Sequence, residues 1–168
     1  MTRSAPVALV KETARLATAF RGSHVTGFDI AGDEAGYALD PHVPAFEWVA
    51  DHGINITAHA GEARGPEGVW ETLAKVRPNR IGHGVRSIED ERLIAHLIAR
   101  RVHLEVCPGS NLQTGVAASM EEHPADRLYR LGVPLGISTD TRTITDITLN
   151  QEYDRLARTF GWTSGHFL

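Results

Sequence analysis

The stretch INITAHAGE, residues 54–62, decides how the rest of the chain is interpreted. Its apolar start, residues 54–56, indicates a short β-strand, and Gly65-Pro66 soon afterwards is typical of a helix start. His59 and Glu62 therefore lie where a strand gives way to a loop. In α/β proteins this is where chemistry is usually done. We take these two residues as the first candidates for a functional site.

The same order of strand, polar loop and helix recurs along the chain. Strands are expected over residues 25–30, 54–58, 80–82, 102–106 and 133–137. Helices are expected from Pro6, from Asp40 as N-cap, from Pro66, after Ser87 as N-cap, through residues 128–131, and from the capping box of Thr148 and Gln151 to Gly161. About 25 to 30 residues per unit is the spacing of βα repeats around a parallel sheet.

Two α/β architectures fit five such units. One is an open doubly wound sheet, and the other is a partial TIM (β/α)₈ barrel. A complete barrel usually has eight units and about 200 to 250 residues, so five units do not close one alone. Residues 1–168 are expected to form a single, incomplete barrel domain.

Composition narrows the class of protein. With 42% hydrophobic and 23% charged residues, the chain has the composition of a globular domain with a real core. The net charge of -4 and the lack of a Lys/Arg cluster argue against nucleic acid as a partner. No apolar run approaches the roughly 20 residues that span a bilayer, and no signal-peptide core is evident at the N-terminus. No membrane partner is expected, and the cytoplasm is the expected compartment.

Polar side chains gather at the expected C-terminal ends of all five strands. They are Asp29, Gly32, Asp33 and Glu34, then His59 and Glu62, then His83, then Ser110 and Asn111, and finally Asp140. In a barrel these ends converge on one mouth. Two histidines, a glutamate and an aspartate there suit a zinc site with a general acid beside it. The alternative is a set of ordinary caps and loop hydrogen bonds.

Five motifs, in this order, resemble the second half of adenosine deaminases, a family of the metal-dependent amidohydrolase superfamily. They are GFDIAGDE (27–34), AHAGE (58–62), RIGHG (80–84), LEVCPGSNLQTG (104–115) and ISTD (137–140). The resemblance covers most of the chain, from about Val25 to the last helix. It implies the C-terminal part of a TIM barrel and the zinc-dependent, hydrolytic deamination of adenosine or deoxyadenosine to inosine and ammonia.

The resemblance also implies catalytic and metal-binding roles by position. His59 looks like a Zn²⁺ ligand, and Asp140 like a second ligand that also handles the proton of the attacking water. Glu62 resembles the acid that protonates N1 of the purine, and His83 the residue that orients the attacking hydroxide. The chemistry is coherent, because zinc lowers the pKa of a bound water to about 7 and the ring nitrogen still needs a proton.

Substrate-binding roles follow in the same way. Gly32 matches a backbone donor to the purine ring, while Asp29 and Asp33 are expected to shape that loop. Thr141 stands where the family commonly has an aspartate or asparagine that helps to hold N7. A threonine hydroxyl can still donate there, with less charge assistance, so the reaction type is less affected than substrate preference.

Only half of the family's zinc ligands are expected in this chain. The other two belong to a His-x-His pair at the end of the family's first strand, and no two of the nine histidines here stand two residues apart. Two of the usual four protein ligands are therefore present. The chain is expected to be a fragment that lacks the first three strands of the barrel.

Other reactive residues are expected to be structural. Cys107, the only cysteine, excludes an intrachain disulfide and a Cys-rich zinc site. It is expected to be a buried hydrophobe and not a nucleophile, because no helix N-terminus or cation is evident beside it. Asn111 and Gln113 are interpreted as structural hydrogen-bonding residues near the mouth, and His123 as a surface or core residue.

Two alternatives to the adenosine deaminase function remain. The chain could be a non-catalytic half-barrel that binds a purine or assembles with a complementary half-barrel chain or with itself. Unpaired edges of its first and fifth strands would favour such assembly. Within enzymes, it could be a deaminase of adenine or of another aminopurine.

Overall fold

The computed structural model describes residues 1–167, and its five strands form one parallel sheet. The strands are β1 (Gly27–Ile30), β2 (Asn55–Ala60), β3 (Arg80–His83), β4 (His103–Val106) and β5 (Leu135–Ile137). Each strand pairs in parallel with the next one along the chain. A doubly wound sheet reverses its strand order at a switch point, so this sequential order excludes that alternative. The fold is α/β, a partial TIM barrel.

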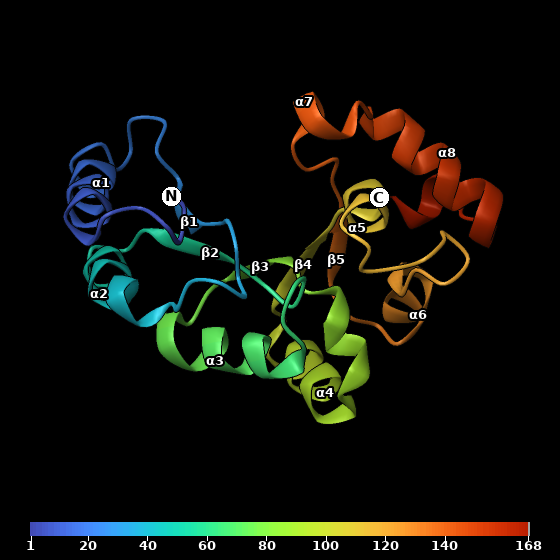
Figure 1. Cartoon of the computed structure of the whole chain (residues 1–168), viewed down its shortest axis with the longest axis horizontal. Coiled ribbons are helices and arrows are strands. Elements are labelled where there is room, and N and C mark those ends of the chain that lie inside the picture. The colour runs from blue at the N-terminus through green and yellow to red at the C-terminus, as the bar shows by residue number, and fades with distance from the viewer. Residues whose placement is uncertain (168) are drawn as a thin grey trace.

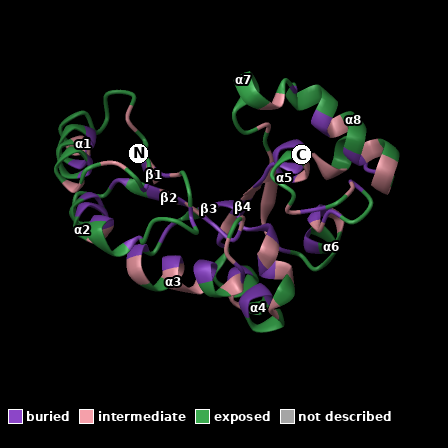
Figure 2. Cartoon of the chain, in the orientation of Figure 1, coloured by how far each residue is buried: buried purple, intermediate pink, exposed green. Residues whose placement is uncertain are grey.

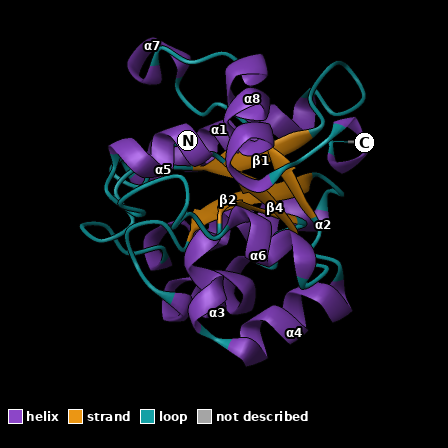
Figure 3. Ribbon diagram, turned by 90° about the vertical axis from the view of Figure 1, so that its right-hand side faces the viewer, coloured by secondary structure: helices purple, strands orange, loops and turns teal. Residues whose placement is uncertain are grey.

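Helices lie before, between and after the strands. They are α1 (Val7–Ala19), α2 (Val43–Asp51), α3 (Pro66–Val76), α4 (Glu91–Arg100), α5 (Pro108–Gln113), α6 (Ala125–Arg130), α7 (Arg142–Thr145) and α8 (Leu149–Phe160), with short 3₁₀ helices at Asp40–His42, Val85–Glu89 and Ser164–His166. Figure 1 shows an open arc, with α1 and α2 at one end, α3 and α4 along its middle and α6 and α8 at the other end. Figure 3 shows α3 and α4 on the same side of the strands from a second direction.

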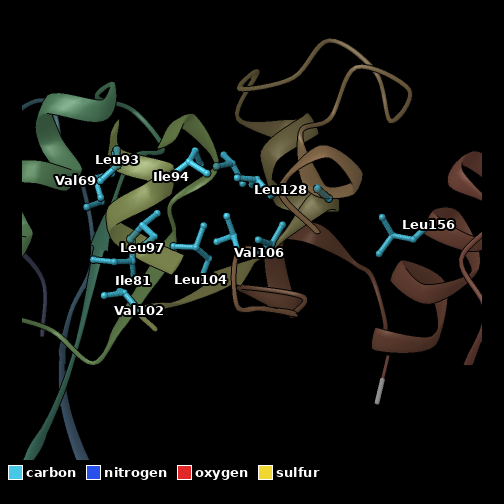
Figure 4. Packing of buried hydrophobic residues seen from close by; sticks show 14 of the residues in the cluster. Val69, Ile81, Leu93, Ile94, Leu97, Val102, Leu104, Val106, Leu128 and Leu156 are labelled. Atoms are coloured by element: carbon cyan, nitrogen blue, oxygen red, sulfur yellow. The ribbon is translucent and has the colours of Figure 1, made fainter. Parts of the chain in front are cut away.

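The core lies between the strands and these helices. Leu93 and Leu97 on α4 are fully buried in one cluster with Ile81 of β3 and Leu104 of β4 (Figure 4). Burial of each such side chain stabilises the fold by roughly 1.5–3 kcal/mol. Figure 2 shows that α4 exposes its opposite face, as an amphipathic helix should.

Two expected helix caps are wrong. Asp40 lies inside a 3₁₀ helix without a side-chain capping bond, because its carboxylate binds Lys75 Nζ at 2.7 Å. Ser87 is buried within another 3₁₀ helix, and Asp90 caps α4 by accepting from the backbone N–H of Leu93 and of the residue before it. The capping box of Thr148 and Gln151 is confirmed.

The first residues of the chain cover part of the outer edge of the sheet, beside β1. The expectation of an unpaired edge is partly wrong for β1, because the first residues of the chain lie against its C-terminal end. The Ala31 N–H donates to the Met1 carbonyl at 2.8 Å, and the Arg3 N–H donates to the Ala31 carbonyl at 2.8 Å.

Within residues 1–167, no helix is long and apolar enough to cross a membrane.

Candidate functional site

Four of the sequence-predicted residues meet at the C-terminal ends of β2, β3 and β5. His83 Nε2 lies 3.4 Å from Glu62 Oε2 and 3.8 Å from Asp140 Oδ2. The rings of His59 and His83 lie edge to face, with their centroids 5.1 Å apart. His83 is 2% exposed, whereas Glu62 and Asp140 keep 23% and 28% of their side-chain surface open. A buried imidazole therefore faces two carboxylates that a ligand can reach.

Two residues of this group adopt a backbone conformation that non-glycine residues rarely use. His83 has φ of +60° and Asp140 has φ of +57°. Such conformations cost of order 1–3 kcal/mol and cluster at functional sites. The Ser110 hydroxyl donates to Asp140 Oδ2 at 2.7 Å. Burial of Asp140 opposes its ionisation, but Ser110 and His83 outweigh burial and lower the pKa of this carboxyl below its usual value.

The ring of His59 lies against Gly82, its partner on the neighbouring strand β3. A Cβ at Gly82 would come within 2.7 Å of His59 Nδ1, so any other residue would displace the ring. Burial of His59 opposes protonation, but the carboxylates of Asp29, Asp140 and Glu62 outweigh it and raise the pKa of the imidazole. The field that favours a proton here also favours a metal cation.

Glu34 holds the loop that connects His59 and Glu62. Its Oε1 accepts the Gly61 N–H at 2.9 Å, and its Oε2 accepts the N–H groups of residues 62, 63 and 64 at 3.1–3.2 Å. The Glu34 side chain is 5% exposed. Arg3, also buried, donates to the His59 carbonyl at 2.9 Å. The sequence placed Glu34 in a polar strand-end loop but gave no signal that its carboxylate faces backbone donors 27 residues or more away.

His123 belongs to the same network, which the sequence did not indicate. Its Nε2 lies 3.2 Å from Asn111 Oδ1, and Asn111 Nδ2 lies 3.2 Å from His83 Nδ1. All three side chains are buried, at 3%, 0% and 2% exposure respectively. The structural interpretation of Asn111 is confirmed, and His123 is a core residue directly behind the candidate site.

Acidification between about pH 6.5 and pH 4 is expected to destabilise the fold through His123. Burial lowers the pKa of this imidazole to about 4, whereas the unfolded chain titrates near 6.5. As the pH falls through this window, the unfolded chain binds a proton that the folded chain does not. About 3 kcal/mol of stability present above pH 6.5 is therefore lost by pH 4.

Urea unfolding at about pH 7.5 and pH 4 measures this loss, because the free energy of unfolding is obtained at each pH. The His123→Gln variant has no group that titrates at this position. Its pH-dependent loss should be about 3 kcal/mol smaller than that of the wild type. Equal losses in the two proteins would contradict the burial of a neutral His123.

The remaining candidates lie around this group. The Thr141 hydroxyl donates to Asp140 Oδ1 at 3.2 Å. Gly32 follows β1 with φ of +91°. Asp33 shapes its own loop by accepting from two backbone N–H groups at 2.8 and 3.0 Å, whereas Asp29 faces His59. Gln113 donates to the Thr145 carbonyl at 3.2 Å.

Cys107 is buried, as expected, but the reason given for its inertness is wrong in part. The residue immediately precedes α5, so a helix N-terminus is present beside it. Burial nevertheless raises the pKa of the thiol to about 12. A protonated, buried thiol is a poor nucleophile.

The side chains present suit part of a zinc site. Imidazole nitrogen and carboxylate oxygen are ordinary zinc ligands. His59 Nδ1 and Asp29 Oδ1 lie 3.7 Å apart, and both are buried without a hydrogen-bond partner among residues 1–167. A carboxylate beside Nδ1 favours the tautomer that leaves Nε2 free to bind a metal. Within the same residues, no three His, Cys, Asp or Glu side chains are grouped closely enough to hold a metal ion.

Sequence comparisons agree with this geometry. A family model described as "Adenosine deaminase" matches residues 1–167. The adenosine deaminase of Mycobacterium ulcerans (strain Agy99) is 43% identical over 166 residues, which cover 92% of this chain and 46% of that protein. The chain spans about half the length of the curated relatives it matches.

Solved structures show the same fold. Arabidopsis ADAL complexed with IMP matches with a TM-score of 0.87 and 27% identity, over 97% of this chain and 47% of that chain. An amidohydrolase from Burkholderia ambifaria, with bound Zn, matches with a TM-score of 0.88 and 20% identity, over 99% of this chain and 47% of that chain. At that identity the second match shows the fold alone.

Proposed function

This chain belongs to the adenosine deaminase family, and from that premise we propose that it carries one half of an adenosine deaminase active site. The reaction is the hydrolytic removal of the amino group of adenosine or deoxyadenosine, which releases inosine, or its deoxy form, and ammonia. The observation that supports it best is the approach of His83 Nε2 to Glu62 and Asp140, at 3.4 and 3.8 Å, from three separate strand ends.

Each residue of this group has a distinct task in the proposal. Glu62 gives a proton to N1 of the purine, which makes C6 electrophilic. Asp140, held as a carboxylate, takes the proton of the attacking water. His83 orients that water through Nε2, which faces both carboxylates. Together these groups supply the acid, the base and the alignment that the addition step needs.

Substrate contacts extend the proposal to two neighbouring residues. The Gly32 N–H donates to the purine ring, and the Thr141 hydroxyl donates toward N7. Thr141 already donates to Asp140 Oδ1, so its hydroxyl would have to exchange that bond for the substrate. This competition predicts looser recognition of N7 than a dedicated side chain would give.

Zinc is the proposed cofactor, and when bound it makes a water nucleophilic near neutral pH. In this chain His59 and Asp140 would hold it. A catalytic zinc site normally has three protein ligands or more. We therefore propose that the remaining ligands come from a complementary half-barrel, either in another part of a longer chain or in a separate chain, or else from a second copy of this chain.

The isolated chain is expected to bind zinc weakly and through His59. Two ligands are too few for a tight tetrahedral site, so the affinity of the isolated chain for Zn²⁺ should lie well below that of a complete deaminase. Because His59→Ala removes one of these two ligands, the affinity of this variant should be at least about tenfold lower still. Titration calorimetry with Zn²⁺ measures both. His103→Ala is the control, because His103 lies at the start of β4 and should leave zinc binding unchanged. Equally tight binding by wild type and His59→Ala would contradict the assignment.

Reconstitution tests the proposed function. The chain would be produced together with the part of the Mycobacterium ulcerans enzyme that it leaves unmatched, and ammonia release from adenosine, deoxyadenosine and adenine would be compared. We expect release from the nucleosides by the reconstituted enzyme and little by the isolated chain. A well-folded, zinc-loaded complex that releases no ammonia from any of them would contradict the proposal and favour a non-catalytic, purine-binding half-barrel.

An aminopurine other than adenosine is the second candidate substrate. The Arabidopsis protein with IMP supports it, because IMP is a purine nucleotide and the chain is 27% identical to that protein. Measuring ammonia release from AMP as well as from adenosine and adenine separates these two candidate substrates. Faster turnover of AMP or adenine than of adenosine would replace adenosine as the proposed substrate.

A further inference from the structure

Behind the candidate site, a line of buried side chains connects His83 to the protein interior. The backbone N–H of Ala125 meets His123 Nδ1 at 3.1 Å, and His123 Nε2 meets Asn111 Oδ1 at 3.2 Å. Asn111 Nδ2 then meets His83 Nδ1 at 3.2 Å. Two imidazoles and one amide are thus joined end to end from the start of α6 to the end of β3.

The direction of every bond in this line is set from its backbone end. At one end, a backbone N–H can only donate, so His123 Nδ1 must accept and Nε2 must carry the proton. Asn111 Oδ1 then accepts from His123, which turns the amide nitrogen toward His83. At the other end, Asn111 Nδ2 also donates to Glu62 Oε1 at 3.4 Å. An Oε1 that accepts from Asn111 agrees with the amide orientation that the backbone donor at the other end already requires.

We propose that Asn111 and His123 are positioning residues that fix the tautomer of His83, with Nδ1 unprotonated and Nε2–H directed at Glu62 and Asp140. The role of this tautomer in catalysis rests on the proposed function, but the tautomer itself is a property of the chain. Because Nδ1 accepts from Asn111, the single proton of a neutral His83 must sit on Nε2. His83 then acts as a hydrogen-bond donor to the reacting oxygen, and Asp140 is left as the base.

The environment of His123 supports this arrangement. The residue is 3% exposed, and burial lowers the pKa of its imidazole to about 4, so it stays neutral at physiological pH. A neutral imidazole has one donor and one acceptor, which is what the line requires at this position. A charged His123 would have two donors and would leave the Ala125 N–H without an acceptor.

The test is the ¹⁵N NMR spectrum of the histidine rings, which distinguishes protonated from unprotonated nitrogens and needs neither substrate nor zinc. In the wild-type chain, His83 is expected to show a bare Nδ1 and a protonated Nε2, with its signals assigned by their loss in His83→Gln. In Asn111→Asp with the introduced carboxyl ionised, both side-chain oxygens can only accept, so His83 Nδ1 is expected to gain a proton. His42→Gln is the matched control, because His42 is equally buried but bonds the Arg3 carbonyl away from this line.

A protonated Nδ1 on neutral His83 in the folded wild type would overturn the inference, whether or not Asn111→Asp folds. An unchanged His83 spectrum in folded Asn111→Asp, recorded where the ¹³C shift of the introduced carboxyl shows that it is ionised, would overturn it as well. If His83 shows the expected tautomer but the reconstituted enzyme deaminates none of the substrates, only the proposed function is contradicted. Deamination by an enzyme whose His83 carries the proton on Nδ1 would contradict only the tautomer.

Discussion

Replacing Glu62 with glutamine is expected to lower kcat for adenosine by about 10²–10⁴-fold in the reconstituted enzyme. Glutamine has nearly the same shape but no acidic proton to give to N1. It can keep the hydrogen bonds that Glu62 Oε1 accepts from Asn111 Nδ2 at 3.4 Å and from the Thr114 hydroxyl at 3.2 Å. The loss should therefore appear mainly in kcat, while KM and stability change little.

Steady-state ammonia release by the reconstituted enzyme measures this effect. Glu67→Gln is the matched control, because this carboxylate belongs to the same region but is 64% exposed on α3. It should retain wild-type activity. A Glu62→Gln enzyme with wild-type kcat would show that another group protonates the ring, and the role assigned to Glu62 would be wrong.

Replacing Glu34 with glutamine is expected to destabilise the chain by roughly 3–5 kcal/mol. The Glu34 carboxylate accepts four backbone N–H groups, and three of them share Oε2. A glutamine has one amide oxygen and one amide nitrogen, so in either orientation its own N–H bonds would face at least one of these donors, which would be left unpaired. The buried Arg3, whose charge Glu34 helps to balance, would lose a partner as well.

Urea unfolding of the isolated chain measures this loss without requiring activity. Asp33→Asn is the matched control, because the adjacent carboxylate also accepts two backbone N–H bonds but is exposed to water. Its cost should stay near 1 kcal/mol or below. A loss below 1 kcal/mol in Glu34→Gln as well would mean that water, and not Glu34, satisfies the loop that carries Glu62.

The sequence predicted most of the fold because βα units are indicated by short-range sequence features. Apolar runs of strand length, prolines at helix starts and the capping box at Thr148 are all short-range features. The cap at Asp40 was predicted wrongly for the opposite reason. Lys75, which binds Asp40, is 35 residues away, and no short-range pattern announces such a partner.

The sequence by itself determined which residues stand at the strand ends, because the ordered motifs around His59, Glu62, His83 and Asp140 are continuous in the chain. Only the tertiary structure decided what supports them. Glu34 and His123 reach the site through side-chain bonds across 27 and 12 residues. The direction of such bonds depends on where the strands and helices pack in space. Donor and acceptor roles are therefore fixed by the folded sheet and not by the order of residues.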